Sequence, residues 1–141
     1  MTRGQRVAKE ARTWLGTPFR WQAAQKRVGC DCKGLLWGVA RDLGFPEADS
    51  IYAKVADYSP KRPVDGRLLR EGMAALFDPV ERPRAGDVLL LRLGSNPSHL
   101  AIYSGPNRVI HAKIGGKSWV KETRLDALLT KFPLDSVWRW R

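Results

Sequence analysis

The chain contains few of the features that mark secreted, disulfide-stabilised or membrane-spanning proteins. Among its 141 residues there are only two cysteines. One residue separates Cys30 from Cys32, a spacing that rarely meets the distance and dihedral angle of a disulfide, so we expect two free thiols. No run approaches the roughly 18 apolar residues of a membrane-spanning helix. The N-terminus also lacks the apolar stretch of a Sec signal, so we expect synthesis in the cytoplasm without a signal peptide and no membrane insertion.

Acidic residues are scarce in the sequence. There are 14 Asp and Glu against 25 Lys and Arg, which gives a formal net charge of +11. Such a charge favours an anionic partner, either a nucleic acid or a carboxylate-rich polymer, although a solubilising surface would have the same composition. The six tryptophans could stack on bases, but no known nucleic-acid-binding motif is present, so we expect no nucleic-acid partner.

The first part of the chain has the pattern of helices. With 43% hydrophobic residues the sequence can bury one core, and we expect residues 1–141 to form a single domain. Thr2 and Asp31 are preferred N-cap residues, and the apolar spacing after each predicts a helix, the first ended by Gly16 and the second by Gly44. The expected apolar face of the first helix consists of Val7, Ala8, Ala11, Trp14 and Leu15.

The remainder of the chain changes from helices to strands. Residues 45–65 have no sustained period, which predicts a long irregular segment held down by Tyr52 and Tyr58. We expect a short helix over 67–77 and a helical turn over 126–131. The predicted strands cover 88–93, 99–104, 108–113, 118–122 and 136–140. Short turns between them favour antiparallel pairing, and helices followed by strands predict an α+β domain.

Cys32 is the strongest candidate for a catalytic residue. It follows Asp31 and so lies in a first helical turn, where the partial positive charge of the helix N-terminus favours a thiolate. A thiol nucleophile also needs a base and a group that orients the base. The chain has two histidines, and both of them, His99 and His111, lie in predicted strands. They are the candidates for these two roles.

The same residues allow other interpretations. Cys30, Cys32, His99 and His111 could together bind zinc, but one residue lies between the cysteines and eleven lie between the histidines. Zinc sites usually have about two to four residues between paired cysteines and about three to five between paired histidines. We therefore expect no metal and no cofactor. Cys30 is either a small buried apolar residue, which we favour, or a redox or resolving thiol.

Five short motifs occur in order: GTPFRW at 16–21, DCKGL at 31–35, RAGDV at 84–88, HLAIY at 99–103 and VIHA at 109–112. With these motifs the chain resembles the NlpC-type family of papain-like cell-wall endopeptidases over roughly residues 6–112. The resemblance implies a papain-like NlpC-type fold, in which N-terminal helices pack on a C-terminal antiparallel β-sheet. The short basic form is similar to the phage-type peptidases carried in the tails of phages and of gene transfer particles.

The resemblance also implies roles for single residues. Cys32 would be the nucleophile, His99 the general base and acid, and His111 the group that orients His99. We expect four residues to contact the substrate: Asp31, Lys33, Phe19 and Trp21. Two of them depart from the family pattern, because Phe19 stands where many members carry a tyrosine and Lys33 stands where a small serine is common. Lys33 adds a cation beside Cys32, which either favours the thiolate or contacts a substrate carboxylate.

The function implied by the resemblance is hydrolysis of the cell wall. The family acts on the peptide stems of peptidoglycan, commonly at the bond between D-γ-glutamate and the diamino acid. We therefore expect a cysteine peptidase of a phage-like tail that binds tail tip or hub proteins and acts in the periplasm or cell wall of a target cell. The alternative is a non-catalytic basic structural tail protein that retains the peptidase fold.

Overall fold

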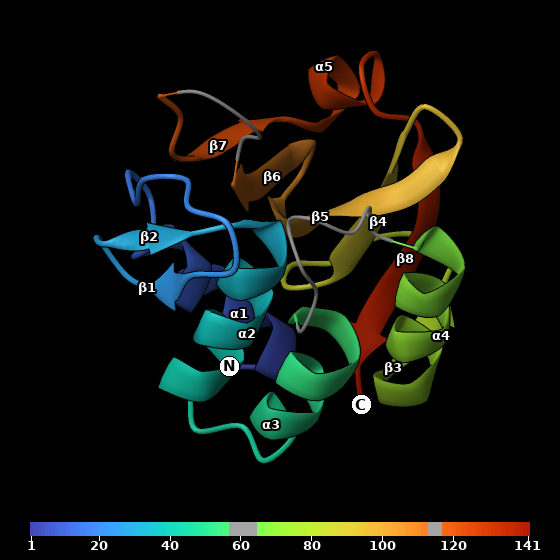
Figure 1. Cartoon of the computed structure of the whole chain (residues 1–141). Coiled ribbons are helices and arrows are strands. Elements are labelled where there is room, and N and C mark those ends of the chain that lie inside the picture. Colours follow the sequence, from blue (N-terminus) through green and yellow to red (C-terminus); the bar gives the residue numbers. More distant parts are fainter. Residues whose placement is uncertain (57–64, 113–116) are drawn as a thin grey trace.

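Helices and strands separate along the chain in the computed structural model, which describes residues 1–56, 65–112 and 117–141. The helices are α1 (Arg3–Arg12), α2 (Cys32–Asp42), α3 (Ala48–Ile51), the π-helix η1 (Tyr52–Ala56), α4 (Gly66–Leu76) and α5 (Leu125–Leu129). The strands are β1 (Ala24–Gln25), β2 (Gly29–Cys30), β3 (Phe77–Val80), β4 (Val88–Leu93), β5 (Asn96–Gly105), β6 (Arg108–Ala112), β7 (Val120–Arg124) and β8 (Leu134–Trp140). Figure 1 shows their arrangement.

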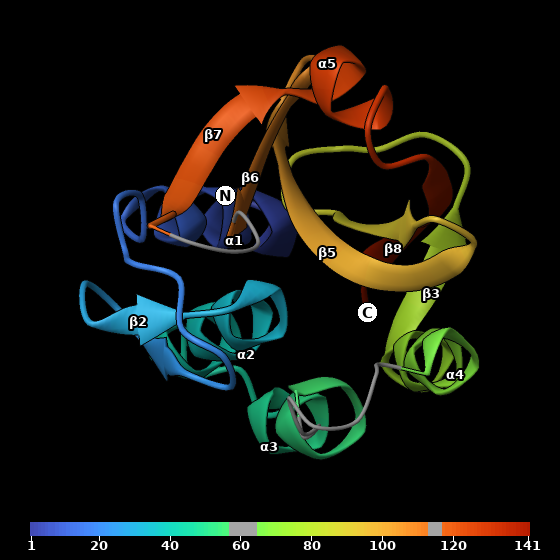
Figure 2. The same cartoon turned by 45° about the horizontal axis from the view of Figure 1, so that its top comes forward.

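A six-stranded sheet forms the centre of the molecule. Its strand order is β3-β8-β4-β5-β6-β7, and every neighbouring pair is antiparallel, while β1 and β2 form a separate two-stranded sheet. The helices α1, α2 and α4 contact β5, and α5 contacts β7. Figure 2 shows α2 and α3 on one side of β5 and α5 on the other. These observations confirm the predicted α+β fold, with N-terminal helices packed on an antiparallel sheet.

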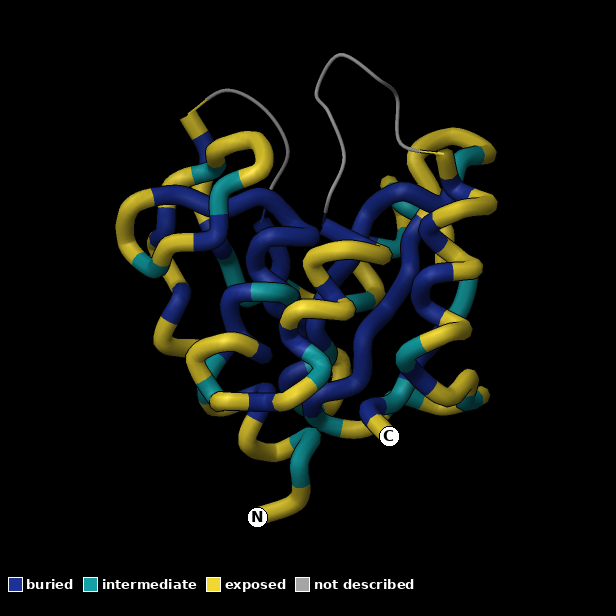
Figure 3. Tube along the Cα trace, turned by 60° about the horizontal axis from the view of Figure 1, so that its bottom comes forward, coloured by how far each residue is buried: buried dark blue, intermediate teal, exposed yellow. Residues whose placement is uncertain are grey.

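The sheet is buried on both faces. Leu90 of β4 packs in a hydrophobic cluster with Leu35 of α2, whereas Leu89 and Leu91 pack in a second cluster with Leu128 of α5. This alternation follows from the strand geometry, in which successive side chains point to opposite faces. The buried stretches of the chain accordingly run through the middle of the molecule in Figure 3.

Both predicted helix starts are confirmed. Thr2 forms a capping box with Gln5, since the Thr2 hydroxyl accepts a hydrogen bond from the Gln5 N–H at 3.1 Å and the Gln5 side chain accepts one from the Thr2 N–H at 2.8 Å. Asp31 caps α2 through the N–H of Gly34. Gly44 follows α2 with a φ of +72°, which is the left-handed conformation expected beyond a helix end.

The predicted apolar face of the first helix is wrong at its C-terminal end. Trp14 is fully buried, but Leu15 is 42% exposed. The reason is that α1 ends at Arg12 and the chain turns away through Gly16, whose φ is +86°. Leu15 therefore no longer lies at helical spacing from the residues before it.

The segment predicted to be irregular contains α3 and η1. Ala48, Ile51 and Val55 are buried at a spacing of three and four residues, and this short helical period was masked by the surrounding polar residues. The ring of Tyr52 lies against that of Trp37, with 4.6 Å between centroids. Tyr58 lies outside the described residues.

Most predicted strands are present, with shifted ends. The β4 strand has the predicted bounds, and α4 and α5 lie within one or two residues of the predicted helical segments. β5 begins at Asn96 because Asn96 and Pro97 pair with the end of β4. β3 was missed since it contains Pro79. It is the edge strand of the described sheet, paired with β8 on one side, and so tolerates a proline. The two-residue strands β1 and β2 are too short for a periodic signal.

Among the described residues, no helix has the length and apolar character needed to cross a lipid bilayer.

Candidate active site

Asp31 fixes the start of α2. One carboxylate oxygen accepts a hydrogen bond from the Gly34 N–H at 2.6 Å, and the other accepts one from the Gln22 N–H at 2.7 Å. The side chain is almost fully buried. It therefore joins the turn that carries Trp21 to the helix that carries Cys32. The predicted contact of Asp31 with substrate stays a prediction, and its observed role is structural.

Gly34 brings the same turn against the helix. A Cβ atom at this position would lie 1.9 Å from the carbonyl oxygen of Ala23. No side chain fits there, so the glycine allows the 20–23 turn to pack directly on the first turn of α2. The local sequence thus sets the position of this turn, which carries Trp21 and is called the aromatic turn below, relative to Cys32.

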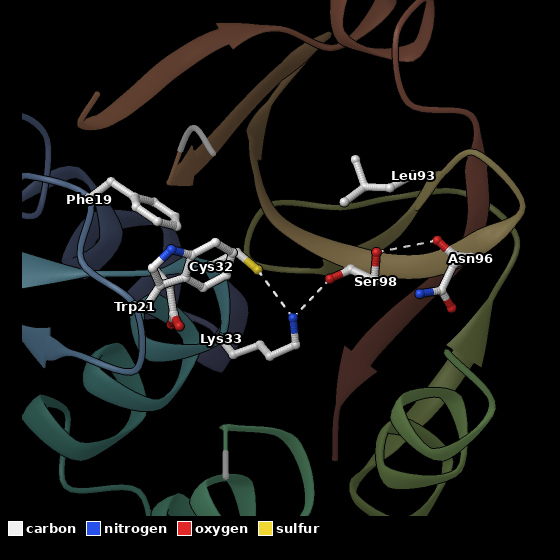
Figure 4. A pocket seen from close by; sticks show the side chains of 8 residues that line it. Phe19, Trp21, Cys32, Lys33, Leu93, Asn96 and Ser98 are labelled. Carbon is white, nitrogen blue, oxygen red and sulfur yellow. Dashed lines mark hydrogen bonds between the residues drawn. The ribbon is translucent and has the colours of Figure 1, made fainter. Parts of the chain in front are cut away.

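Cys32 lines a cavity of about 240 Å³ between α2 and the β4–β5 hairpin. Its lining residues are Phe19, Trp21, Asp31, Cys32, Lys33, Leu93, Asn96 and Ser98 (Figure 4). The structure therefore brings together all four residues that were predicted to contact substrate. Leu93, Asn96 and Ser98 were not identified from the sequence. The available signal was the position of Ser98 directly before a candidate catalytic histidine.

Two aromatic rings form one wall of this cavity. Phe19 and Trp21 pack edge to face, with 5.0 Å between their centroids. Trp21 is 53% exposed, which is unusual for so large an apolar side chain in a domain of this size. An exposed aromatic ring beside a thiol offers an apolar surface on which a ligand can pack.

Lys33 is buried between the helix and the sheet, with only 3% of its surface exposed. Its Nζ donates a hydrogen bond to the Ser98 carbonyl oxygen at 2.8 Å and lies 3.6 Å from Cys32 Sγ. Figure 4 shows the ammonium between these two atoms. Lys33 thus links the first turn of α2 to β5 at the residue that precedes His99.

The two histidines form a buried pair on β5 and β6. His99 Nε2 lies 3.2 Å from His111 Nδ1, and the rings meet nearly at right angles. Burial, followed by the charges of His111 and Lys33, lowers the pKa of His99 from 6.5 to about 3. His99 is therefore neutral at pH 7. Its Nδ1 is buried and has no hydrogen-bond partner within the described residues.

The cysteine and the histidine pair line different cavities. His99 and His111 face a cavity of about 320 Å³, whose other lining residues are Lys121, Thr123, Ala127, Leu128, Lys131 and Phe132. Over residues 1–56, 65–112 and 117–141, the structure gives no hydrogen bond between Cys32 and His99. It therefore places Cys32 with Lys33, and His99 with His111. The predicted contact between thiol and imidazole stays a prediction.

Cys30 differs from Cys32 in its surroundings. It is fully buried and, like Cys32, it is a free thiol. Burial, followed by the charges of Asp31 and Cys32, raises the pKa of Cys30 to about 12. These properties agree with the interpretation of Cys30 as a small buried apolar residue. In the part of the chain that the structure describes, no group of three or more His, Cys, Asp or Glu side chains is placed to hold a metal ion.

Comparison with known proteins gives two curated relatives, both named as peptidases. "Probable peptidoglycan endopeptidase LytE" of Bacillus subtilis (strain 168) is 28% identical over 112 residues, which are 79% of this chain and 28% of that protein. "Dipeptidyl-peptidase 6" of Lysinibacillus sphaericus is 25% identical over 130 residues, which are 92% of this chain and 38% of that protein. The chain thus spans less than two fifths of the length of these relatives.

Solved structures share the fold. The NlpC/p60 domain of the peptidoglycan hydrolase SagA superposes with a TM-score of 0.63 at 24% identity, covering 97% of this chain and 98% of that one. NlpC2 from Trichomonas vaginalis gives a TM-score of 0.68 at 19% identity, covering 97% of this chain and 46% of that one. The sequence model of the NlpC/P60 family matches residues 16–132, a segment that holds the capped helix of Cys32 and both histidine strands. The chain therefore belongs to the NlpC/P60 family.

Proposed function

We propose that this chain is a cysteine endopeptidase that cuts the peptide stems of peptidoglycan. One observation carries the proposal: an NlpC/P60 domain has a thiol at the first residue of α2 and a neutral, buried imidazole on β5, that of His99. The Nε2 atom of His99 contacts His111, and its Nδ1 atom has no hydrogen-bond partner within the described residues. A base with one nitrogen oriented and the other available is the arrangement that a thiol nucleophile requires.

The chemistry assigned to these residues is acyl transfer. His99 Nδ1 takes the proton of Cys32, Sγ attacks the carbonyl carbon of the stem, and the C–N bond breaks as the proton passes from Nδ1 to the leaving amine. Water then hydrolyses the thioester, with His99 again as the base. For the first step, Sγ and Nδ1 must come within hydrogen-bond distance of each other. The Cys32 N–H would serve in the oxyanion hole, where one donor is worth about 2.7 to 4 kcal/mol.

The names of the relatives support this substrate class. One curated relative carries the name of a peptidoglycan endopeptidase, and one structural neighbour is a peptidoglycan hydrolase. The name of the other curated relative, a dipeptidyl-peptidase, supports the cleavage of peptide bonds. The aromatic wall of Phe19 and Trp21 gives the stem an apolar surface beside the thiol. We propose the bond between D-γ-glutamate and the diamino acid as the site of cleavage, on the basis of the family resemblance.

The test is digestion of purified sacculi followed by mass analysis of the released stems. We expect the wild-type protein and Cys30→Ser to release the same fragments, and Cys32→Ser to release none. The masses identify the bond that is cut. Equal labelling of both single variants by iodoacetamide would contradict the assignment of Cys32 as the reactive thiol. An inactive wild-type protein would instead favour the non-catalytic structural protein.

We further propose that the protein works as part of a phage-like tail. The support is the similarity of this basic chain, with its net charge of +11, to the phage-type peptidases. The positive charge would favour approach to the anionic wall, with an attraction that weakens as salt shortens the Debye length to about 8 Å. Quantitative mass spectrometry of purified particles and cleared lysate tests the proposal. The protein should be enriched in the particles at low copy number, and a protein found only in the soluble fraction would contradict it.

A further inference from the structure

We propose that Lys33 recognises a carboxylate that the substrate carries beside the bond being cut. The enzyme would then prefer stems whose D-γ-glutamate has a free α-carboxylate over stems in which that group is an amide. This inference rests on the proposed peptidase function and deepens it, because it names the chemical group that the Cys32 cavity selects.

The first argument is the distance from Lys33 to the nucleophile. Nζ lies 3.6 Å from Cys32 Sγ, so a carbonyl carbon under attack by Sγ is held close to the ammonium. In γ-linked glutamate the α-carboxyl carbon is four covalent bonds from that carbonyl carbon. Four bonds of about 1.5 Å each extend over about 5 Å at most. The carboxylate can therefore reach Nζ while the carbonyl group lies on Sγ.

The second argument is how Lys33 is held. The hydrogen bond from Nζ to the Ser98 carbonyl oxygen, at 2.8 Å, anchors the side chain between α2 and β5. An ammonium has three N–H donors on a flexible stem. When Sγ becomes bonded to the acyl carbon, the N–H directed at the sulfur can turn to an oxygen of the substrate, and the anchor to Ser98 is kept.

The third argument is the charge of the cavity. Among the described residues that line it, two are charged, Asp31 and Lys33, and the others are aromatic, aliphatic or uncharged polar residues. Both oxygens of Asp31 accept hydrogen bonds from backbone amides, so its charge is directed to the protein. Lys33 therefore supplies the positive charge of a cavity with apolar walls, where an ion pair is stronger than in water.

A different role for Lys33 makes a different prediction. If its charge served only to favour the thiolate of Cys32, its removal would slow the cleavage of every substrate by the same factor. If Lys33 instead recognises a carboxylate, its removal would slow the cleavage of the stem with a free α-carboxylate and leave the cleavage rate of the amide stem unchanged. The ratio of the two rates therefore separates specificity from activation of the thiol.

The experiment compares two synthetic stem peptides that differ only in whether the D-glutamate α-carboxyl is free or a carboxamide. We expect the wild-type protein to cleave the acid with a kcat/KM at least about tenfold higher than that for the amide, because the loss of a charge-assisted hydrogen bond usually has an effect of this size. Lys33→Gln keeps a donor for Ser98 but loses the charge, and its ratio should fall to near one. Lys33→Arg keeps the charge and should keep the preference for the acid. An unchanged ratio in Lys33→Gln would overturn the inference.

A binding measurement keeps this inference separate from the proposed function. Calorimetry with Cys32→Ser should give tighter binding of the acid than of the amide, and the double variant with Lys33→Gln should bind both alike. If the wild-type protein cleaves neither stem, the peptidase proposal fails and the binding data alone decide on Lys33. Equal binding of both stems by Cys32→Ser, or binding of neither, would refute recognition by Lys33.

Discussion

His99 Nε2 lies 3.2 Å from His111 Nδ1, so one of these two nitrogens carries the proton and the other accepts it. If the proton is on His99, the Nδ1 of His99 keeps its lone pair and can act as a base. His111 then sets the tautomer of His99 by accepting this hydrogen bond. His99 and His111 therefore have different roles, one as the base and the other as the group that orients the base, and their substitution should lower activity to different extents.

Substitution of His99 should cost more activity than substitution of His111. We expect His99→Ala to lower kcat/KM on stem peptides by about 10² to 10⁴, since the proton acceptor is lost. His111→Asn keeps a side chain that can hydrogen-bond to Nε2, so it should lose less. Steady-state rates of both variants, with circular dichroism to verify folding, provide the measurement. Equal and complete loss in two folded variants would contradict these roles.

The lowered pKa of His99 should make the fold sensitive to mild acid. In the unfolded chain His99 takes up a proton below its ordinary pKa of 6.5, whereas burial and the charges of His111 and Lys33 keep it neutral in the folded protein down to about 3. Protons therefore favour the unfolded state over this window. The contribution of neutral His99 to the free energy of unfolding is fully present above pH 6.5 and is lost as the pH falls towards 3. Between pH 7 and pH 5 the loss is about 2 kcal/mol.

Urea unfolding at pH 7 and pH 5 measures this loss, with His99→Asn as the matched variant. The carboxyl groups of Glu122 and Asp135 have ordinary pKa values of 4.5 and 3.8, so most of their titration lies below pH 5. The variant should lose less stability than the wild-type protein over the same interval. If both proteins lose the same amount, another group is responsible.

Asp87 should contribute more to stability than the similar residue Asp78. The buried carboxylate of Asp87 accepts a hydrogen bond from Arg139 at 2.7 Å and another from the Arg84 N–H at 2.7 Å. Asp87→Ala leaves the Arg84 N–H and the partly exposed Arg139 without their acceptor, and an unsatisfied donor of this kind costs about 1 to 3 kcal/mol, so the free energy of unfolding should fall by about 2 kcal/mol. Asp78 pairs with Arg141 at the surface, and Asp78→Ala should cost less than about 1 kcal/mol. Denaturant unfolding of the two variants compares them, and equal losses would refute the argument.

Gly34→Ala should disturb the start of α2. The new Cβ atom would lie 1.9 Å from the Ala23 carbonyl oxygen, a backbone atom that cannot move without shifting the aromatic turn. Overpacking of this kind costs about 1 to 3 kcal/mol. Gly105→Ala is the control, because no atom of the residues that the structure describes lies within 4 Å of its added Cβ. Thermal unfolding should show a lower midpoint for Gly34→Ala only, and an unchanged midpoint would mean that the turn can relax.

Local sequence signals predicted the elements that depend on neighbouring residues. The capping residues Thr2 and Asp31 and the apolar spacing after them determine where α1 and α2 begin. The thiol of Cys32 at a helix start follows from the same signals. Errors occurred where a distant contact overrode a local rule, as with Pro79, which forms an edge strand because β8 lies beside it.

The composition of the site depended on tertiary packing. From the sequence, Lys33 was a cation beside Cys32, but its burial against Ser98 requires α2 to pack on a strand 65 residues further along the chain. The contact of His99 with His111 likewise depends on the pairing of β5 with β6. The sequence alone determined the starts of α1 and α2, most strands of the six-stranded sheet and the residue types available for chemistry, because these depend on neighbours along the chain. Only the tertiary structure decided which side chains meet, because that depends on the register of the strands and on how the helices pack across the sheet.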